Sequence, residues 1–459
     1  MNTKKNREEL FESCPVPKAV ATLALPTIAS SIVTVIYSLA DTFFVGMLND
    51  PIETSAVTLI APVILLFNAV TNLFGVGCSS LMSRALGVKD YTTVRKSAAF
   101  GVYCAILCGL LFSAFSIIFK YPLLTLLGAD ENTADCCAAY LLWTVNCGAI
   151  PSILNVVMSN LNRAEGSAMH ASAGVMAGCI LNMILDPFFI LPQFLNMGAA
   201  GAGCATFISN TCACLYFIIL LIIKGKNTFV CIDPVMAVPN KTVAKEVFSV
   251  GIPASIQNIL NVTGMTLLNN ITAGYGAEAV SAMGIAHKVA LVPLYFSMGG
   301  GQGVMPLVGY NYASGNRARM KEAIRFAEKI FIISMFAAGA LFFIFAGPLI
   351  KLFMTNELIV EYGTGFLRGF SVAIPFLALD FLAVAMFQAC GKGRISLIFA
   401  VLRKVVLEIP AFIIFNKIFG MYGLSYGQPF AEIILAVAAF IMLEKMMNEA
   451  PEKLSFQEK

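Results

Sequence analysis

Two aspartates lie inside long apolar segments of the sequence, where ionisable side chains are uncommon. Asp41 falls late in the first apolar segment, four residues after Tyr37, and Asp186 falls in the fifth, four residues after Asn182. A spacing of four residues places the two side chains of each pair on one face of a helix. Because an ionisable group inside a membrane is costly, both aspartates are candidates for a functional site.

Two carboxylates that share a dry site repel each other, and the loss of water favours their neutral forms. A small cation, either H⁺ or Na⁺, would relieve this repulsion. Tyr37, Asn182 and Thr206 of the sixth apolar segment could supply further oxygen ligands. The pattern therefore predicts a cation-coupling site at Asp41 and Asp186. The alternative is that Asp186 only caps a helix or hydrogen-bonds locally and that Asp41 ends a helix near the membrane surface.

Apolar segments long enough to cross a bilayer must position these residues. Hydrophobic residues make up 58% of the chain and charged residues 12%, whereas a soluble domain has about 25% charged residues. Twelve segments reach the roughly 20 residues that span a membrane. We therefore expect an all-α membrane protein with twelve transmembrane helices. The predicted spans are 18–47, 56–84, 96–119, 138–162, 169–192, 198–223, 244–271, 277–309, 323–348, 360–391, 394–418 and 421–446.

The basic residues predict the orientation of the spans. The N-terminal tail, the even-numbered connections with the adjoining span ends, and the C-terminal tail hold 23 of the 30 Lys and Arg residues. The opposite connections hold three, Lys120, Lys351 and Lys417. This asymmetry predicts that both termini are cytoplasmic. The first span has no clear cleavage site, so we expect it to be retained.

An internal repeat relates the two halves of the chain at an offset of 222–228 residues. Because each repeat contains six spans, an even number, both halves enter the membrane in the same orientation, related by a pseudo-twofold axis along the membrane normal. We expect an N-lobe at 1–223, a cytoplasmic linker at 224–243 and a C-lobe at 244–459. The matched pairs are Pro26 with Pro253, Gly87 with Gly315, Gly166 with Gly391, and Gly201 with Gly423.

The second half does not repeat the acid pair, since the position that corresponds to Asp41 is Leu268. Internal ion pairing, for example of Arg403 with Glu408 or Asp380, is the expected role of its charges, and substrate contact is the alternative. Cation coupling is therefore expected in the first half. The ionisable residues in or near spans of the second half are Lys288, Arg368, Arg403, Lys404, Asp380, Glu408 and Glu432.

Several other classes of function lack a signature in the sequence. The run Gly299–Gly303 has no Gly-Lys-Ser/Thr ending of a phosphate-binding loop, and no His-Glu-x-x-His or Gly-x-Ser-x-Gly motif occurs. Two histidines and thirteen scattered cysteines do not form a zinc pattern. A net charge of +4 does not indicate nucleic acid. We expect no enzyme activity and no cofactor, and as partners only the lipid bilayer and a small organic substrate. A channel is less favoured because no segment resembles a selectivity filter.

At these residues the sequence resembles the multidrug and toxic compound extrusion (MATE) family, and it is especially similar to the MepA-like branch of bacterial multidrug exporters. The resemblance covers roughly residues 10–447. The motifs that carry it are Pro26, Tyr37–Gly46, Ser83–Gly87, Arg163–Gly166, Leu181–Pro187, Gly198–Thr206, Gly251–Pro253, Phe387–Gly393 and Leu402-Arg403.

The resemblance implies a V-shaped pair of six-helix lobes in the bacterial cytoplasmic membrane, acting as a monomer. It implies antiport, in which H⁺ or Na⁺ enters while cationic, amphipathic compounds such as drugs leave. By position, Asp41, Asn182, Asp186 and Thr206 match the cation site of the first lobe, where Na⁺ is the only metal ion expected. Pro26 matches the proline at which the first helix of the family is proposed to bend.

The sequence departs from the family pattern in the seventh span. Some relatives have an acidic residue there, whereas this chain has Gln257 and Asn261, although Asp380 lies close to a position that is acidic in those relatives. This departure puts a second-lobe Na⁺ site in doubt and leaves Gln257, Asn261 and Lys288 as candidates for lining a substrate cavity. The alternative function is a flippase of a lipid-linked saccharide, for which Lys288 and Arg403 would supply positive charge.

Overall fold

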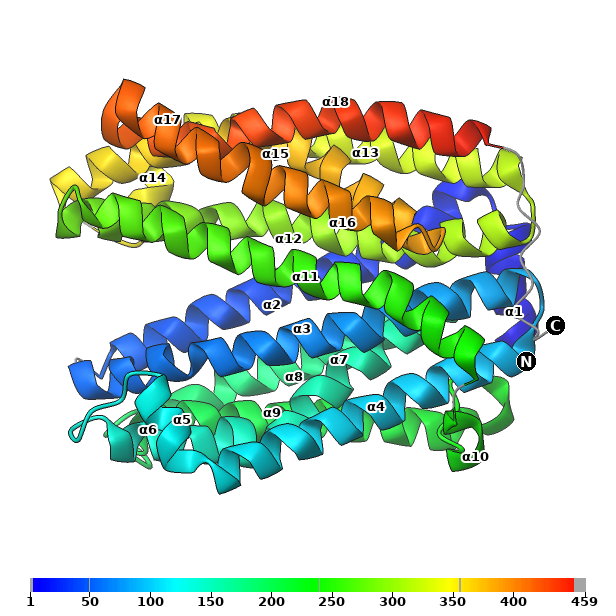
Figure 1. Ribbon diagram of the computed structural model, residues 1–459, viewed down its shortest axis with the longest axis horizontal. Helices are drawn as coiled ribbons and strands as arrows, with labels where there is room; N and C mark the ends of the chain where they lie inside the picture. The colour runs from blue at the N-terminus through cyan, green and yellow to red at the C-terminus, as the bar shows by residue number, and fades with distance from the viewer. Residues whose placement is uncertain (1–2, 49, 239, 355, 450–459) are drawn as a thin grey trace.

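The computed structural model describes residues 3–48, 50–238, 240–354 and 356–449, and this part of the chain is helical without β-strands. Its helices follow the predicted order (Figure 1). The spans of the first half are α2 (Val16–Gly46), α3 (Pro51–Gly87), α4 (Tyr91–Ile118), α6 (Ala134–Leu141) continued by η1 (Leu142–Cys147) and α7 (Ala149–Ala164), α8 (Ala168–Ile190) and α9 (Gly198–Lys224). Those of the second half are α11 (Lys241–Ala273), α12 (Ala277–Ala313), α13 (Arg317–Ile344), α15 (Glu357–Ala389), α16 (Gly393–Val401) continued by η3 (Leu402–Glu408) and α17 (Ile409–Phe419), and α18 (Gly427–Asn448).

Hydropathy alone identifies most of these spans. Within the described residues, eight helices are long and apolar enough to cross a membrane, and the pair α6–α7, bent by 46°, makes a ninth. The remaining three, α11, α16–α17 and α18, carry polar residues that line the cavities described below. The expected fold class, an all-α protein with twelve spans, is confirmed.

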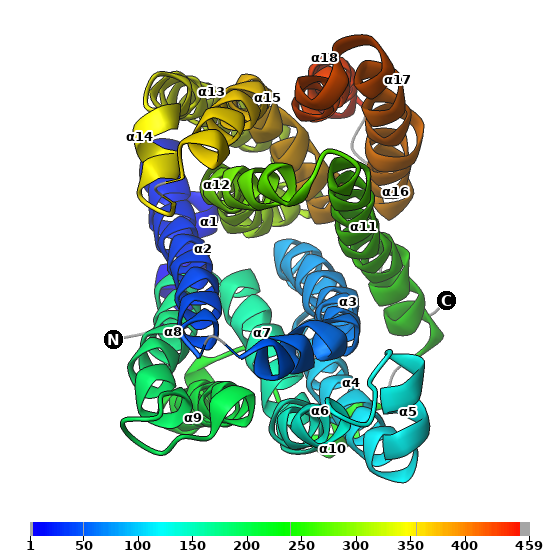
Figure 2. The ribbon, with the colours of Figure 1, turned by 90° about the vertical axis from the view of Figure 1, so that its left-hand side faces the viewer.

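The spans form two bundles that meet along a pair of equivalent contacts. Figures 1 and 2 show α2–α9 on one side and α11–α18 on the other. Between the bundles, α2 packs against α12 and α3 packs against α11. These contacts join the first span to the eighth and the second to the seventh, so the pseudo-twofold axis exchanges them.

Two glycines allow α3 and α11 to cross at very short distance. A Cβ atom on Gly77 would lie 2.5 Å from the carbonyl oxygen of Val247, and one on Gly251 would lie 2.0 Å from the carbonyl oxygen of Leu73. Membrane helices approach each other closely where small residues face the partner backbone. In this contact, each helix therefore packs a glycine against the backbone of the other.

Helix α1 (Thr3–Glu12), which the sequence analysis did not predict, lies across one end of both bundles. We call this the basic end, where α1 and the connections at 88–90, 165–167, 225–238, 314–316 and 390–392 lie (Figure 1). Phe11 is 2% exposed and stacks on Tyr310 with ring centroids 5.0 Å apart. The Arg319 guanidinium donates to the main-chain oxygens of Leu10, Phe11 and Cys14 at 3.1, 2.6 and 2.5 Å. It thus satisfies carbonyl groups that the end of a helix leaves free.

Glu165 attaches the same end of the first bundle to α1 and to the linker. Its carboxylate is fully buried and lies 2.8 Å from the Arg7 guanidinium and 3.7 Å from the Lys224 ammonium. It also accepts hydrogen bonds from the Thr228 hydroxyl and the Phe229 amide, both at 2.8 Å. One buried charge therefore holds α1, the end of α9 and the linker together.

Candidate functional site

The predicted cation-coupling residues come together from three helices of the first bundle. Helix α2 carries Tyr37 and Asp41, α8 carries Asn182 and Asp186, and α9 carries Thr206. Asp186 is fully buried and Asn182 is 2% exposed, whereas the other three side chains are partly exposed. The hydrogen-bond partner of Asp186 is Asn182 on the same helix, and Asn182 in turn contacts Thr206 on α9.

The Asn182 amide connects Asp186 to Thr206. In the amide orientation that satisfies both neighbours, its nitrogen donates to the two Asp186 carboxylate oxygens at 2.9 and 3.2 Å. Its oxygen then accepts from the Thr206 backbone amide at 3.0 Å and from the Thr206 hydroxyl at 3.2 Å. The Tyr37 hydroxyl lies 3.5 Å from the same Thr206 hydroxyl. The charge state of Asp186 is therefore linked by hydrogen bonds to side chains on α8, α9 and α2.

One residue beside this site, Tyr140, was not predicted from the sequence. Asp41 and Asp186 are close enough to interact electrostatically with each other, and Tyr140 on α6 is 6% exposed and interacts with both. Among the described residues, no Lys, Arg or His forms an ion pair within 4.0 Å of either aspartate. The acid pair thus has no built-in cation.

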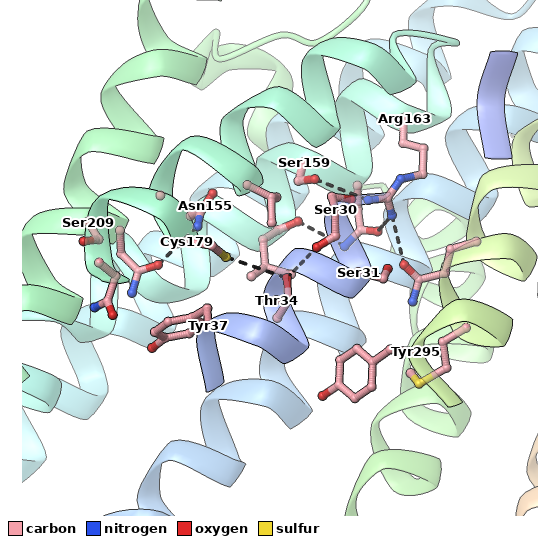
Figure 3. Close-up of a pocket in the computed structure, with 18 of the residues that line it drawn as sticks. Ser30, Ser31, Thr34, Tyr37, Asn155, Ser159, Arg163, Cys179, Ser209 and Tyr295 are labelled. Carbon is pink, nitrogen blue, oxygen red and sulfur yellow. Dashed lines mark hydrogen bonds between the residues drawn. The ribbon is translucent and has the colours of Figure 1, made fainter. Parts of the chain in front are cut away.

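A cavity of about 300 Å³ adjoins this site toward the centre of the protein (Figure 3). Its wall includes Tyr37, Asn182 and Thr206, so three of the predicted cation-site residues face both the acid pair and the cavity. Hydroxyl, amide and thiol groups make up much of the rest of the wall, contributed by Ser30, Ser31, Thr34, Asn155, Ser159, Asn160, Cys179, Ser209, Asn210 and Gln302. Neutral polar groups of this kind can orient a ligand without fixing its charge.

Arg163, in the last turn of α7, also lines this cavity. Its guanidinium donates to the side-chain oxygens of Asn160 and Gln302, both at 3.0 Å. Arg163 belongs to α7 and Gln302 to α12, so this hydrogen bond crosses from the first bundle to the second. The glycine run around Gln302 brings α12 close to α2, where a Cβ atom on Gly303 would lie 2.6 Å from the Cα atom of Ala24.

A second cavity, of about 260 Å³, is lined mainly by the second bundle, with Leu65 and Asn68 of α3 also in its wall, and shares Tyr295 and Met298 with the first. The π-helical segment η3 supplies Arg403, Lys404 and Glu408 to its wall. A π-helical turn changes the register of a helix and is frequent at functional sites. The two cavities therefore meet between the bundles, where α12 contributes to both.

Charges in the second cavity are paired internally, as expected. The Arg403 guanidinium lies 2.8 Å from Asp380 and 3.9 Å from Glu432 and donates to the Asn261 side-chain oxygen at 2.7 Å. Glu408 pairs with the Lys404 ammonium, at 2.6 Å, whereas Arg403 pairs with Asp380. An arginine thus occupies the carboxylate cluster of the second bundle.

The remaining predicted residues are divided between cavity and helix interior. Asn261 lines the second cavity and, with Gln257, a third one of about 50 Å³. Lys288 lies on α12 but lines none of these three cavities. Pro26 lies inside α2, which continues through it as a helix. Among the described residues, no group of three or more His, Cys, Asp or Glu side chains is placed to hold a metal ion.

Comparison with known proteins gives a consistent result for the whole chain. The family model MatE matches residues 26–188 and again residues 253–414, so its two matches begin at Pro26 and Pro253. The multidrug export protein MepA of Staphylococcus aureus (strain MRSA252) is 35% identical over 439 residues, which cover 94% of each chain. The chain therefore belongs to the MATE family of membrane transporters.

Solved structures agree with this assignment. One described as the outward-facing conformation of a multidrug resistance MATE family transporter is 25% identical, with a TM-score of 0.90 over 96% of this chain and 98% of the other. A MATE protein described as being in the straight conformation is also 25% identical, with a TM-score of 0.89 over 96% and 97% of the two chains.

Proposed function

We propose that the protein is an antiporter that exports small amphipathic, often cationic, organic compounds in exchange for H⁺ or Na⁺. The observation that carries this proposal is the acid pair, a fully buried Asp186 and a partly exposed Asp41, which has no cation of its own among the described residues. A buried charge without a partner is unfavourable, so a cation from solution has a reason to bind there. MepA, which is named as a multidrug export protein, supports the direction of transport.

The hydrogen-bond chain from Asp186 suggests how cation binding is transmitted to the substrate. A proton or Na⁺ on Asp186 competes with the Asn182 amide for the carboxylate oxygens. Asn182, Thr206 and Tyr37 then lose their present hydrogen-bond pattern, and all three form part of the cavity wall. Binding of the cation therefore changes the part of the cavity wall that contacts the substrate. The substrate is then held less tightly and is released.

The packing of the bundles supports an outward-open state. At the basic end the bundles are joined by α1, by the Gly77 and Gly251 contacts and by the Arg163–Gln302 hydrogen bond. If this end and both termini are cytoplasmic, the cavities are sealed from the cytoplasm. Pro26 in α2 and the linker at 224–243 are the proposed sites of movement toward the inward-open state, in a protein of the bacterial cytoplasmic membrane.

The test is uptake of a fluorescent cationic dye by inside-out vesicles under an imposed pH gradient, and separately under an imposed Na⁺ gradient. We expect accumulation under one of the two gradients, which identifies the coupling ion, and loss of accumulation in Asp41→Asn and Asp186→Asn. Asp50→Asn is the matched control, because Asp50 caps the start of α3 and asparagine caps helices equally well. Normal uptake by Asp41→Asn or Asp186→Asn would refute the mechanism.

The second candidate is a flippase of a lipid-linked saccharide, for which Arg163 in the cavity wall could bind a phosphate group. It is less well supported, because Arg403 and Lys404 are already ion-paired. Translocation of a lipid-linked saccharide in vesicles, with no dye uptake under either gradient, would favour it.

A further inference from the structure

An arginine on the outer surface of the second bundle has no role in the transport proposal. Arg368 is exposed and lies within α15, eleven residues after the helix begins at Glu357. Among the described residues, it forms no ion pair with a carboxylate within 4.0 Å. Its guanidinium lies instead over the ring of Phe343 on α13, 5.6 Å from the centroid. An exposed cation in a membrane-spanning helix is costly unless an anion or water reaches it.

The depth of Arg368 in the membrane follows from its neighbour. Phe343 is the last residue but one of α13, which ends at Ile344, so the Arg368 guanidinium lies level with the end of that helix. α13 starts at the basic end of the molecule and ends at the opposite one (Figure 1). The guanidinium therefore lies in the half of the molecule opposite the basic end.

An apolar groove begins at the same place. It has a volume of about 440 Å³, lies between α13 and α15, and is lined by Phe343 together with Ile332, Phe336, Phe376 and Leu379. The twelve residues from Ile332 to Phe343 rise about 16 Å along α13. This is roughly half of the ~30 Å hydrocarbon core of a bilayer. The groove is therefore about as long as one leaflet is deep.

Two residues, Gly339 and Pro375, allow α13 and α15 to approach closely at the base of the groove. A Cβ atom on Gly339 of α13 would lie 3.1 Å from the carbonyl oxygen of Ser371 on α15, so the helices touch there without a side chain between them. Pro375 has no amide hydrogen and cannot use that carbonyl in the helix. The close contact forms the base, and the larger side chains on either side form the walls.

We propose that Arg368 and this groove bind one anionic phospholipid, with its phosphate on the guanidinium and one acyl chain between α13 and α15. A guanidinium binds phosphate with two parallel hydrogen bonds, which a single cation–aromatic contact does not satisfy. The cation and the groove share Phe343, so one molecule that has both a phosphate and a long chain fits both. The inference does not rest on the proposed antiport.

The experiment is native mass spectrometry of the full-length protein in detergent, titrated with palmitoyl-oleoyl phosphatidylglycerol. Two variants address the two parts of the site. Arg368→Ala removes the phosphate contact, and Ala340→Phe fills the groove at an exposed position where an apolar side chain is tolerated. We expect each variant to weaken the tightest phosphatidylglycerol adduct by about tenfold or more, which is about 1.4 kcal/mol or more.

Matched controls carry the same changes elsewhere. Lys417→Ala removes an exposed cation near the same end of the molecule, and Ala114→Phe enlarges an exposed alanine on α4. Both are expected to bind phosphatidylglycerol within about twofold of the wild type. Because Ala340→Phe keeps Arg368, it tests the groove even if Arg368→Ala cannot be purified.

Three outcomes would overturn the proposal. The first is wild-type affinity in Arg368→Ala or Ala340→Phe. The second is equal loss of affinity in the control variants, which would indicate non-specific lipid contact. The third is competition by glycerol 3-phosphate at the same concentration as the lipid, which would indicate a phosphate site with no use for the groove.

Discussion

Replacing Glu165 by glutamine tests whether one buried charge holds α1 and the linker to the first bundle. The substitution preserves the shape of the side chain and removes its charge, leaving Arg7 and Lys224 without their shared partner. One carboxylate oxygen faces Arg7, Thr228 and the Phe229 amide, and the other faces Ser167 and Lys224. In either orientation of the glutamine amide, its NH₂ group faces hydrogen-bond donors, and those donors then lack an acceptor.

The magnitude follows from the burial of the partners. Removing one member of a buried ion pair costs about 3–5 kcal/mol. The side chains of Arg7 and Lys224 are each 11% exposed and keep part of their hydration, so we take the lower limit. A loss of about 3 kcal/mol corresponds to roughly a hundredfold rise in the population in which this contact is open.

The Phe229 amide reports that opening directly, since its hydrogen is bonded to Glu165. Hydrogen exchange measured by mass spectrometry on peptides covering residues 227–231 is expected to be roughly a hundredfold faster in Glu165→Gln than in the wild type. Glu444→Gln is the matched control, because Glu444 pairs with Arg325 at 3.4 Å near the surface, where such pairs contribute little. Exchange in Glu165→Gln within about threefold of the wild type would refute the reasoning.

Two further predictions concern the second bundle and the contact between bundles. Arg403→Gln leaves Asp380 without its cation and should lower the free energy of unfolding by about 3–5 kcal/mol, measured by thermal unfolding, whereas the exposed control Arg325→Gln should change it by less than about 1 kcal/mol. Gly251→Ala places a Cβ atom 2.0 Å from the Leu73 carbonyl oxygen and so disfavours the state in which the basic end is closed. If the free energy of that state rises by about 1.4 kcal/mol or more, dye export should slow about tenfold. Gly284→Ala, with no atom within 4 Å of the new Cβ, should export normally, and equal rates in the two glycine variants would contradict this interpretation.

The fold could be predicted from the sequence because the bilayer imposes a length on each span. The predicted span at 198–223 and the helix Gly198–Lys224 differ by one residue at one end. The predicted span at 244–271 falls short of α11 (Lys241–Ala273) by a few residues, because polar helix ends do not differ in hydropathy from loops. Helix α1 was missed for the same reason, since ten mostly polar residues give no apolar run, although Phe11 among them is buried.

The candidate site could be predicted only in part. Helical spacing brought Asp186 together with Asn182, because both lie on α8. The position of Tyr140 beside the acid pair depends on how α6 packs against the other helices, and no spacing in the sequence encodes it. The contact of Arg163 with Gln302 likewise joins side chains 139 residues apart. The proposed roles of the cation-site residues and of Lys288 stay predictions.

The two bundles share one architecture but differ in how their buried acids are neutralised. In the second bundle, Arg403 is covalently part of the chain and lies 2.8 Å from Asp380, so a cation from solution would have to displace a guanidinium that cannot leave. In the first bundle, Asp41 and Asp186 have no such partner among the described residues. Only an acid pair whose neutralising cation comes from solution can respond to a gradient of that cation. The asymmetry of charge, on a frame whose helix contacts are symmetric, is therefore the physical reason to expect coupling in the first bundle and a structural role for the charges of the second.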